Sequence, residues 1–190
     1  TIFESVDDKS TILIPRNMKQ VINNGLSVSY PLKVFKWWEF SSYFIYNYES
    51  YDGDLGGTII DLKANIYNVR MQNTLRLPAG ITSELTFYYN SPWIWRGSVN
   101  VDGYYGLNFG IKKSFIKDRL QVQLSGNDLL NSSSLYPFRS NYGGMNVDGD
   151  VRFDNRRFGF SLNYKFGNQQ AKGGRRNKSA MDDELRRIGD

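Results

Sequence analysis

The alternation of apolar and polar residues from residue 158 to residue 166 is the feature that most constrains the fold. Every second position holds a large apolar side chain. These positions are Phe158, Phe160, Leu162, Tyr164 and Phe166, and the residues between them are Gly159, Ser161, Asn163 and Lys165. Side chains of a strand point to opposite faces with period 2, so one face would be apolar and the other wet. The pattern fits a transmembrane β-barrel and also a half-buried strand of a soluble sheet.

Composition favours the barrel. The chain has 13 Tyr, 12 Phe and 4 Trp among 190 residues, yet its mean hydropathy is −0.51. Barrel strands combine these properties because half of their positions face a wet interior. No apolar run approaches the ~18 residues that a membrane helix needs. The sequence therefore excludes a helical membrane protein.

Two missing residue types narrow the function. The chain has no Cys and no His, which removes thiol nucleophiles, zinc-thiolate sites, Ser-His catalysis and the commonest metal ligand. We expect no enzyme activity, no cofactor and no metal site. The net charge is +5, but basic residues are dispersed outside the tail, whereas a nucleic-acid site needs a clustered basic face. We expect no nucleic-acid partner.

Period-2 patterns and turn residues predict about eight strands. Their ranges are 1–7, 25–35, 37–52, 58–77, 80–96, 98–116, 119–131 and 150–167. Short turns near residues 36, 79 and 118 alternate with longer links over 8–24, 53–57 and 132–149. The prediction is an all-β, antiparallel, up-and-down transmembrane β-barrel segment over 1–167. A charged tail over 168–190 follows, either flexible or with a short helix.

Large apolar side chains are assigned to the lipid face or to its two interfaces. They are Trp38, Phe87, Trp93, Phe109, Phe158 and Phe160. The alternative is that the tryptophans are anchors in a soluble core. In the fourth strand the apolar phase changes at Ile66 and Tyr67, which predicts a β-bulge. The carboxylates Glu39, Glu49 and Glu84 are assigned to a wet wall.

The predicted link over 132–149 is the candidate ligand loop. It holds Tyr136, Arg139, Tyr142 and Asn146, and aromatic, amide and guanidinium groups suit carbohydrate, siderophore or peptide recognition. A solvated loop without a ligand is the alternative. Asp128 has two interpretations as well: a carboxylate that binds a cation or sugar, or one that closes its own backbone turn.

Three stretches together resemble a known family. They are residues 30–39, which include Tyr-Pro-Leu and Lys-Trp-Trp-Glu, then 126–131, Gly-Asn-Asp-Leu-Leu-Asn, and 156–167, Arg-Arg-Phe to Tyr-Lys-Phe-Gly. In this order they resemble the C-terminal barrel portion of TonB-dependent outer-membrane receptors, in a subfamily with a charged C-terminal tail. The resemblance implies a barrel of about 22 strands, of which this chain would be the last third. A plug and the box that contacts the energy-coupling protein would lie outside this chain.

The resemblance also implies location and partners. It implies the bacterial outer membrane of a Gram-negative cell, with the tail in the periplasm. Tyr164 and Phe166 match two positions of the signal read by the barrel-insertion machinery, although Ser161 stands where that signal has glycine. Outer-membrane lipid, a small solute or glycan and a surface lipoprotein are the other expected partners.

Three hypotheses about function remain open from the sequence. The first is import of a siderophore, glycan or peptide by a TonB-dependent receptor. The second is a self-contained eight-stranded barrel with a structural or adhesive role, since eight strands can close with side chains filling the interior. The third is a soluble β-barrel or sandwich that binds a ligand.

Overall fold

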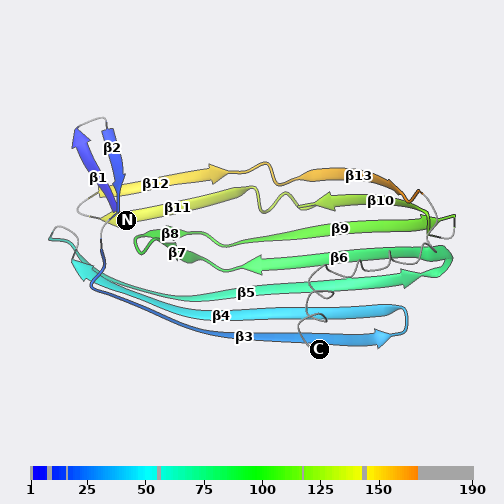
Figure 1. Ribbon diagram of the computed structural model, residues 1–190. Helices are drawn as coiled ribbons and strands as arrows, with labels where there is room; N and C mark the ends of the chain where they lie inside the picture. The colour runs from blue at the N-terminus through cyan, green and yellow to red at the C-terminus, as the bar shows by residue number, and fades with distance from the viewer. Residues whose placement is uncertain are drawn as a thin grey trace, which may run out of the picture.

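The computed structural model describes residues 2–7, 10–15, 17–54, 57–116, 118–142 and 145–166 (Figure 1). The predicted tail over 168–190 lies outside these residues. Within them, the strands are β1 Ile2–Asp7, β2 Ser10–Ile14, β3 Gln20–Phe35, β4 Trp38–Asp54, β5 Ile59–Leu77, β6 Ile81–Asn90, β7 Trp93–Trp95, β8 Val99–Val101, β9 Tyr104–Phe115, β10 Leu120–Asn127, β11 Leu135–Tyr142, β12 Met145–Arg152 and β13 Arg157–Tyr164. A short 3-10 turn, η1 Pro78–Gly80, joins β5 to β6. No described helix has the length and apolar character to cross a membrane.

A seven-stranded sheet forms the main body. Its order is β13-β10-β9-β6-β5-β4-β3, and every neighbouring pair is antiparallel (Figure 1). The turns near residues 36, 79 and 118 all lie at one end of this sheet, which we call the short-turn end. The predicted all-β, antiparallel, up-and-down fold is confirmed.

Beyond the other end, a second sheet continues four of these strands. Its order is β12-β11-β8-β7. Irregular segments near residues 91, 102, 128–134 and 153–156 separate each of its strands from the main strand that it continues. The predicted strands 80–96, 98–116 and 150–167 are therefore each divided in two.

The predicted long link over 132–149 is wrong. This stretch contains β11 and most of β12, paired from Leu135 opposite Arg152 to Tyr142 opposite Met145. The alternation that marks a strand is weak here because the hairpin lies beyond the apolar part of the main sheet. The link predicted over 8–24 likewise holds β2 and the start of β3. The β1–β2 hairpin is a sheet of its own, so β1 is not an eighth strand of the main sheet.

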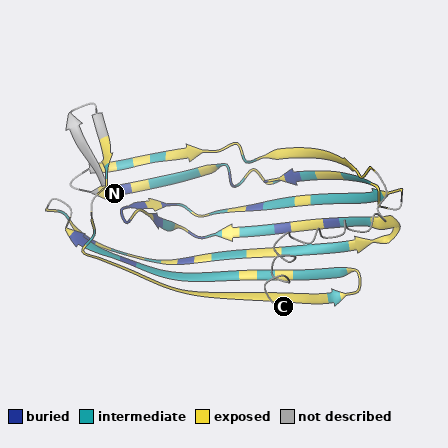
Figure 2. Cartoon of the chain, viewed as in Figure 1, coloured by how far each residue is buried: buried dark blue, intermediate teal, exposed yellow. Residues whose placement is uncertain are grey.

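Strand register joins the apolar sides into one continuous surface. Phe44 lies opposite Val28 and Val69, and further along the sheet Leu124 lies opposite Ile111 and Phe160. We call this surface the apolar face and the opposite side the polar face. Trp38, Phe87, Phe109, Phe158 and Phe160 all lie on the apolar face, as the alternation predicted. Every residue of the edge strand β13 is exposed (Figure 2).

The predicted bulge in the fourth strand is wrong. The β4–β5 register runs from Trp38 opposite Leu75 to Asp54 opposite Ile59 without a shift. In β5 the apolar side chains that precede Tyr67 lie on the polar face, and those from Tyr67 onward lie on the apolar face. Ile60, on the polar face, packs against Met18 and Tyr51 and is only 2% exposed. The apolar side chains change face because Met18 and Tyr51 cover the polar face there, whereas the β4–β5 backbone pairing stays regular.

Aromatic side chains mark both ends of the apolar face. At the short-turn end, Phe35 stacks on Trp37 at 5.5 Å and Trp37 on Trp38 at 6.2 Å. At the other end, tyrosines recur on neighbouring strands. These are Tyr46, Tyr67, Tyr89 and Tyr105. The ten residue-to-residue steps from Tyr67 to Leu77 span about 33 Å along a strand, or about 25 Å along the membrane normal at barrel tilt. The apolar face is thus as tall as the lipid-facing band of a transmembrane barrel.

Candidate binding trough on the polar face

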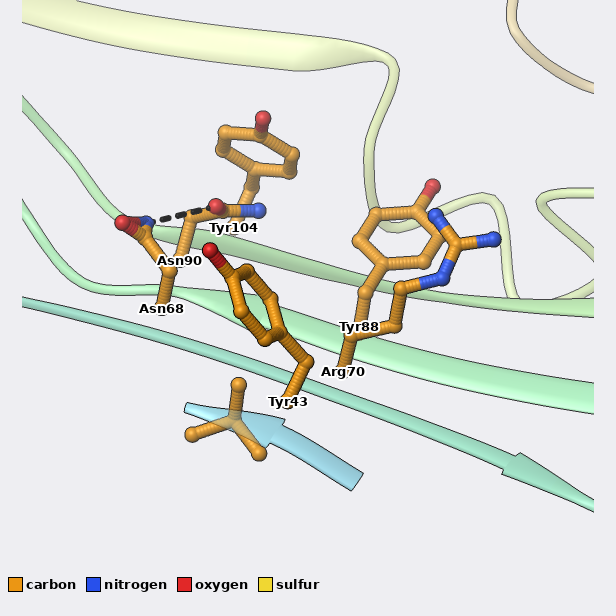
Figure 3. A pocket seen from close by; sticks show the side chains of 7 residues that line it. Tyr43, Asn68, Arg70, Tyr88, Asn90 and Tyr104 are labelled. Carbon is orange, nitrogen blue, oxygen red and sulfur yellow. Dashed lines mark hydrogen bonds between the residues drawn. The ribbon is translucent and has the colours of Figure 1, made fainter. Parts of the chain in front are cut away.

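Three neighbouring cavities hollow the polar face, and Tyr104 lines all of them. The first, of about 280 Å³, is lined by side chains from β4, β5, β6 and β9 (Figure 3). The second measures about 310 Å³ and the third about 330 Å³. Together they run from β4 to β13, across six strands and therefore about 24 Å. We call this surface the Tyr104 trough.

Tyrosine and asparagine dominate the trough. Figure 3 shows Asn68 and Asn90 joined between β5 and β6, with Nδ2 of Asn68 donating to Oδ1 of Asn90 at 2.8 Å. The lining side chains include Tyr43, Glu49, Asn68, Arg70, Tyr88, Asn90, Trp93, Tyr104, Asn108, Asp128, Tyr136, Asn155 and Arg157. Amides and phenol hydroxyls both donate and accept hydrogen bonds, so the trough suits a ligand with many hydroxyl or amide groups.

An aromatic cluster connects the main sheet to the second sheet. The Tyr104 ring lies edge to face with Trp93 at 5.9 Å and with Tyr136 at 4.8 Å, and Tyr136 meets Phe153 at 5.3 Å. Tyr88 meets Tyr104 at 6.3 Å. Edge-to-face geometry is the favoured arrangement of such rings, and it holds β7, β9 and β11 together at this level.

The predicted lipid-facing position of Trp93 is wrong. Trp93 lies opposite Val101 and lines a cavity together with Asn47 and Glu49 of the polar face. Counting every second residue from Phe87 fails because the strand breaks before Trp93. There the amide of Ser91 donates to the Tyr67 carbonyl, and the Tyr67 amide donates to Oγ of Ser91. The break places Trp93 on the face opposite to Phe87.

Asp128 closes its own turn, as one of the two interpretations predicted. Its side chain is 1% exposed and accepts hydrogen bonds from the amides of Ser132 and Ser133 and from Oγ of Ser134. Its φ of 46° lies in the left-handed region, which Asp tolerates better than most residues. Oγ of Ser133 in turn accepts from the Tyr88 hydroxyl at 3.0 Å, so this turn also positions the trough.

The candidate ligand-loop residues do not converge on one site. Tyr136 lies in the trough, but Arg139 is three residues further along β11 and faces the other side, where it pairs with Asp102 at 3.1 Å. Asn146 is exposed and lies opposite Asn141, near the end of the hairpin. The side chain of Tyr142 lies outside the described residues. The loop prediction failed because a strand sends neighbouring side chains to opposite faces.

Charge in and beside the trough is balanced. Arg70 and Arg157 contribute two positive charges, and Glu49 and Asp128 contribute two negative charges. Burial, then the hydrogen bond to Glu49 and its charge, raise the pKa of Tyr51 to about 12. Burial and the neighbouring Tyr104 raise the pKa of Tyr136. Both phenols are neutral near pH 7, and the described residues hold no group of His, Cys, Asp or Glu that could bind a metal ion.

Sequence reasoning missed Tyr88 and Tyr104 as site residues. A signal was present, because each begins a Tyr-Tyr pair within a strand, at 88–89 and at 104–105. Such a pair places one tyrosine on each face. Tyr89 and Tyr105 complete the aromatic end of the apolar face, and Tyr88 and Tyr104 line the trough.

Comparison with known proteins supports the membrane interpretation. The model of a family described as "Outer membrane protein beta-barrel family" matches residues 1–164. No curated protein and no solved structure matches the chain.

Proposed function

Since this chain belongs to the outer membrane protein β-barrel family, we propose that it forms part of the wall of a TonB-dependent receptor that imports a nutrient. Family membership makes it an outer-membrane β-barrel protein, which rules out the soluble binder. The receptor class is supported by the three resembling stretches, all of which contribute to the main sheet or its turns. The trough is the observation that carries import, because it offers a solute a polar, aromatic surface on the face opposite to lipid.

The apolar face would contact lipid. Phe87, Phe109 and Phe160 lie in its middle, and Trp38 lies in the aromatic group at the short-turn end. The indole Nε1 of Trp38 donates to Oδ1 of Asn73 at 3.0 Å, which satisfies a polar side chain on this face. Aromatic groups at both ends match the two girdles of outer-membrane barrels.

Strand direction favours a larger barrel over a self-contained one. Six antiparallel steps separate β3 from β13, so these two edge strands run in the same direction. Closing the sheet on itself would require a parallel pair, whereas bacterial outer-membrane barrels are antiparallel with an even strand number. An odd number of further strands would therefore lie between β3 and β13 in the native barrel. Among the residues that the structure describes, the main sheet has seven strands, one fewer than the eight-stranded structural or adhesive barrel needs.

The remaining partners follow from this assignment. Tyr164 and Phe166 meet edge to face at 4.7 Å at the end of β13, where the barrel-insertion machinery would read them. Residues 168–190 would lie in the periplasm. The plug, and with it the contact to the energy-coupling protein, would belong to other parts of the native receptor. A surface lipoprotein would contact the second sheet.

Growth of a deletion strain tests import. Cells lacking the native receptor would be grown on single-nutrient media that supply ferric siderophores, glycans or peptides. We expect a defect with one class, restored by the wild-type receptor and not by a receptor with Tyr104→Ala and Tyr136→Ala. A strain that lacks TonB should show the same growth defect on the same nutrient. Normal growth of the deletion strain on every medium, or uptake that continues without TonB, would contradict the proposal.

A further inference from the structure

Lys113 is an anomaly on the apolar face. It is the one charged side chain on that face within the described spanning segments. These segments are 26–34, 38–46, 67–77, 81–89, 105–115, 120–126 and 158–164. It lies on β9 directly opposite Ile81 of β6 and Val122 of β10. A charge on a lipid-facing surface is costly unless it reaches the interface or finds a partner.

The structure directs this charge toward the interface. Nζ of Lys113 lies 4.9 Å from the centroid of the Phe115 ring, which is two residues nearer to the short-turn end. A lysine in this position buries its methylene stem along the apolar surface and holds the ammonium at headgroup level. Phe115 adds a cation–π contact that favours this conformation.

More cations gather at the same corner. Arg119 lies in the β9–β10 turn, where its carbonyl accepts the amide of Lys165 at 2.8 Å and its amide donates to Ile116 at 3.2 Å. These contacts extend the β10–β13 pairing by one residue, so Arg119 and Lys165 lie side by side at the rim, at polar-side positions directly beyond Leu120 and Tyr164 of the apolar face. With the exposed Asp118 of the same turn, the four charged residues Lys113, Asp118, Arg119 and Lys165 carry a net charge of +2.

We propose that this group, the Lys113 corner, binds the phosphate of an anionic phospholipid in the leaflet at the short-turn end. A net charge of +2 complements an anionic headgroup such as phosphatidylglycerol. Phosphatidylethanolamine carries its own ammonium and lacks that net charge. The site rests only on the outer-membrane placement of the apolar face and is independent of what the receptor imports.

Lipid retention measures the site directly. The native barrel that contains this chain would be purified in detergent and equilibrated with equal amounts of phosphatidylglycerol and phosphatidylethanolamine. Bound lipids would then be counted by native mass spectrometry. The variants are Lys113→Gln and Lys113→Arg. The matched control is Lys112→Gln, which removes a charge from the next residue, on the polar face opposite Thr82.

We expect the wild type to retain phosphatidylglycerol preferentially and Lys113→Gln to lower that preference about fivefold. Lys113→Arg and Lys112→Gln should keep it. Arg119→Gln, in an exposed turn, gives a second test and should lower it as well. The proposal is overturned if the wild type shows no preference between the lipids, if Lys113→Gln behaves like the wild type, or if Lys112→Gln causes an equal loss.

Discussion

Tyr104 and Tyr136 lie edge to face with ring centroids 4.8 Å apart, and they belong to different sheets. Tyr104 begins β9 of the main sheet, and Tyr136 lies in β11 of the second sheet. Their contact is the centre of the aromatic cluster that lines the trough. It links the membrane wall to the sheet beyond it at the level where the strands are interrupted.

Replacement of Tyr136 by Ala should loosen this link. The ring contacts Trp93, Tyr104 and Phe153, and each aromatic pair contributes about 0.5–1.5 kcal/mol beyond its buried area. We expect Tyr136→Ala to lower the free energy of unfolding by about 2 kcal/mol in lipid, measured by denaturant titration. Tyr43→Ala, which removes an exposed tyrosine of the same trough, is the control and should cost less. Equal losses would mean that the cluster adds nothing specific.

Phe87→Arg should destabilise the barrel in lipid. Phe87 lies in the middle of the apolar face between Met71 and Leu107, where an arginine costs about 2–4 kcal/mol. The control is Gln72→Arg, because Gln72 follows Met71 on β5 and faces the polar side. Reversible unfolding from vesicles would measure both. Unchanged stability of Phe87→Arg would show that the faces are assigned the wrong way round.

Glu39 and Arg76 form a two-pronged ion pair near the short-turn end, with distances of 2.6 and 2.9 Å between carboxylate and guanidinium. Because both side chains are partly exposed, we expect a small, favourable coupling energy in a double-mutant cycle, and we expect salt to reduce it. The exchange Glu39→Arg with Arg76→Glu should recover most of the stability that either single reversal loses. A coupling energy of zero at both low and high salt would show that the ion pair does not contribute to stability.

Asp128→Asn should weaken the turn between β10 and β11. Asparagine tolerates the left-handed backbone, so the change removes mainly the charge and one acceptor from the bonds to Ser133 and Ser134. We expect a loss of about 1–3 kcal/mol in unfolding free energy. Asp118→Asn is the matched control, since Asp118 also has a positive φ, of 64°, but is exposed. A similar small effect of both variants would show that the buried carboxylate is not needed.

Tyr51 should ionise only in strongly alkaline solution. Burial, followed by the hydrogen bond to Glu49, raises its pKa from 10.0 to about 12. A group that binds its proton more tightly when folded contributes stability below its unfolded pKa. That contribution should therefore be present below pH 10 and be lost as the pH rises toward 12. Ultraviolet titration of the wild type against Tyr51→Phe measures it, and a Tyr51 transition near pH 10 would contradict the expectation.

The seven strands of the main sheet were largely predictable because each has the same surroundings along its length, an apolar medium on one face and water on the other. On β13, Phe158 and Phe160 recur with period 2, and both are exposed. A strand between lipid and water has apolar residues on one face and polar residues on the other along its whole span, so the alternation alone assigns its faces. The same holds for Phe87 and Phe109, whose predicted face agrees with the register.

Prediction failed where that uniform environment ends. The apolar residues of β5 before Tyr67 follow the other phase because Met18 and Tyr51 cover Ile60. Trp93 changes face because the strand is interrupted at Ser91. In both places a contact with a residue distant in the sequence decides which face a side chain occupies, and the periodicity of the sequence does not reveal such a contact.

The amino-acid sequence by itself determined the class of fold, the position of most main-sheet strands and the face that each presents to an apolar medium. These depend on local backbone geometry and on a solvent that is the same for every strand. Only the tertiary structure decided the β11–β12 hairpin, the trough around Tyr104 and the direction in which Lys113 points. Each of these depends on strand register and on strand interruptions, which bring residues from different hairpins together.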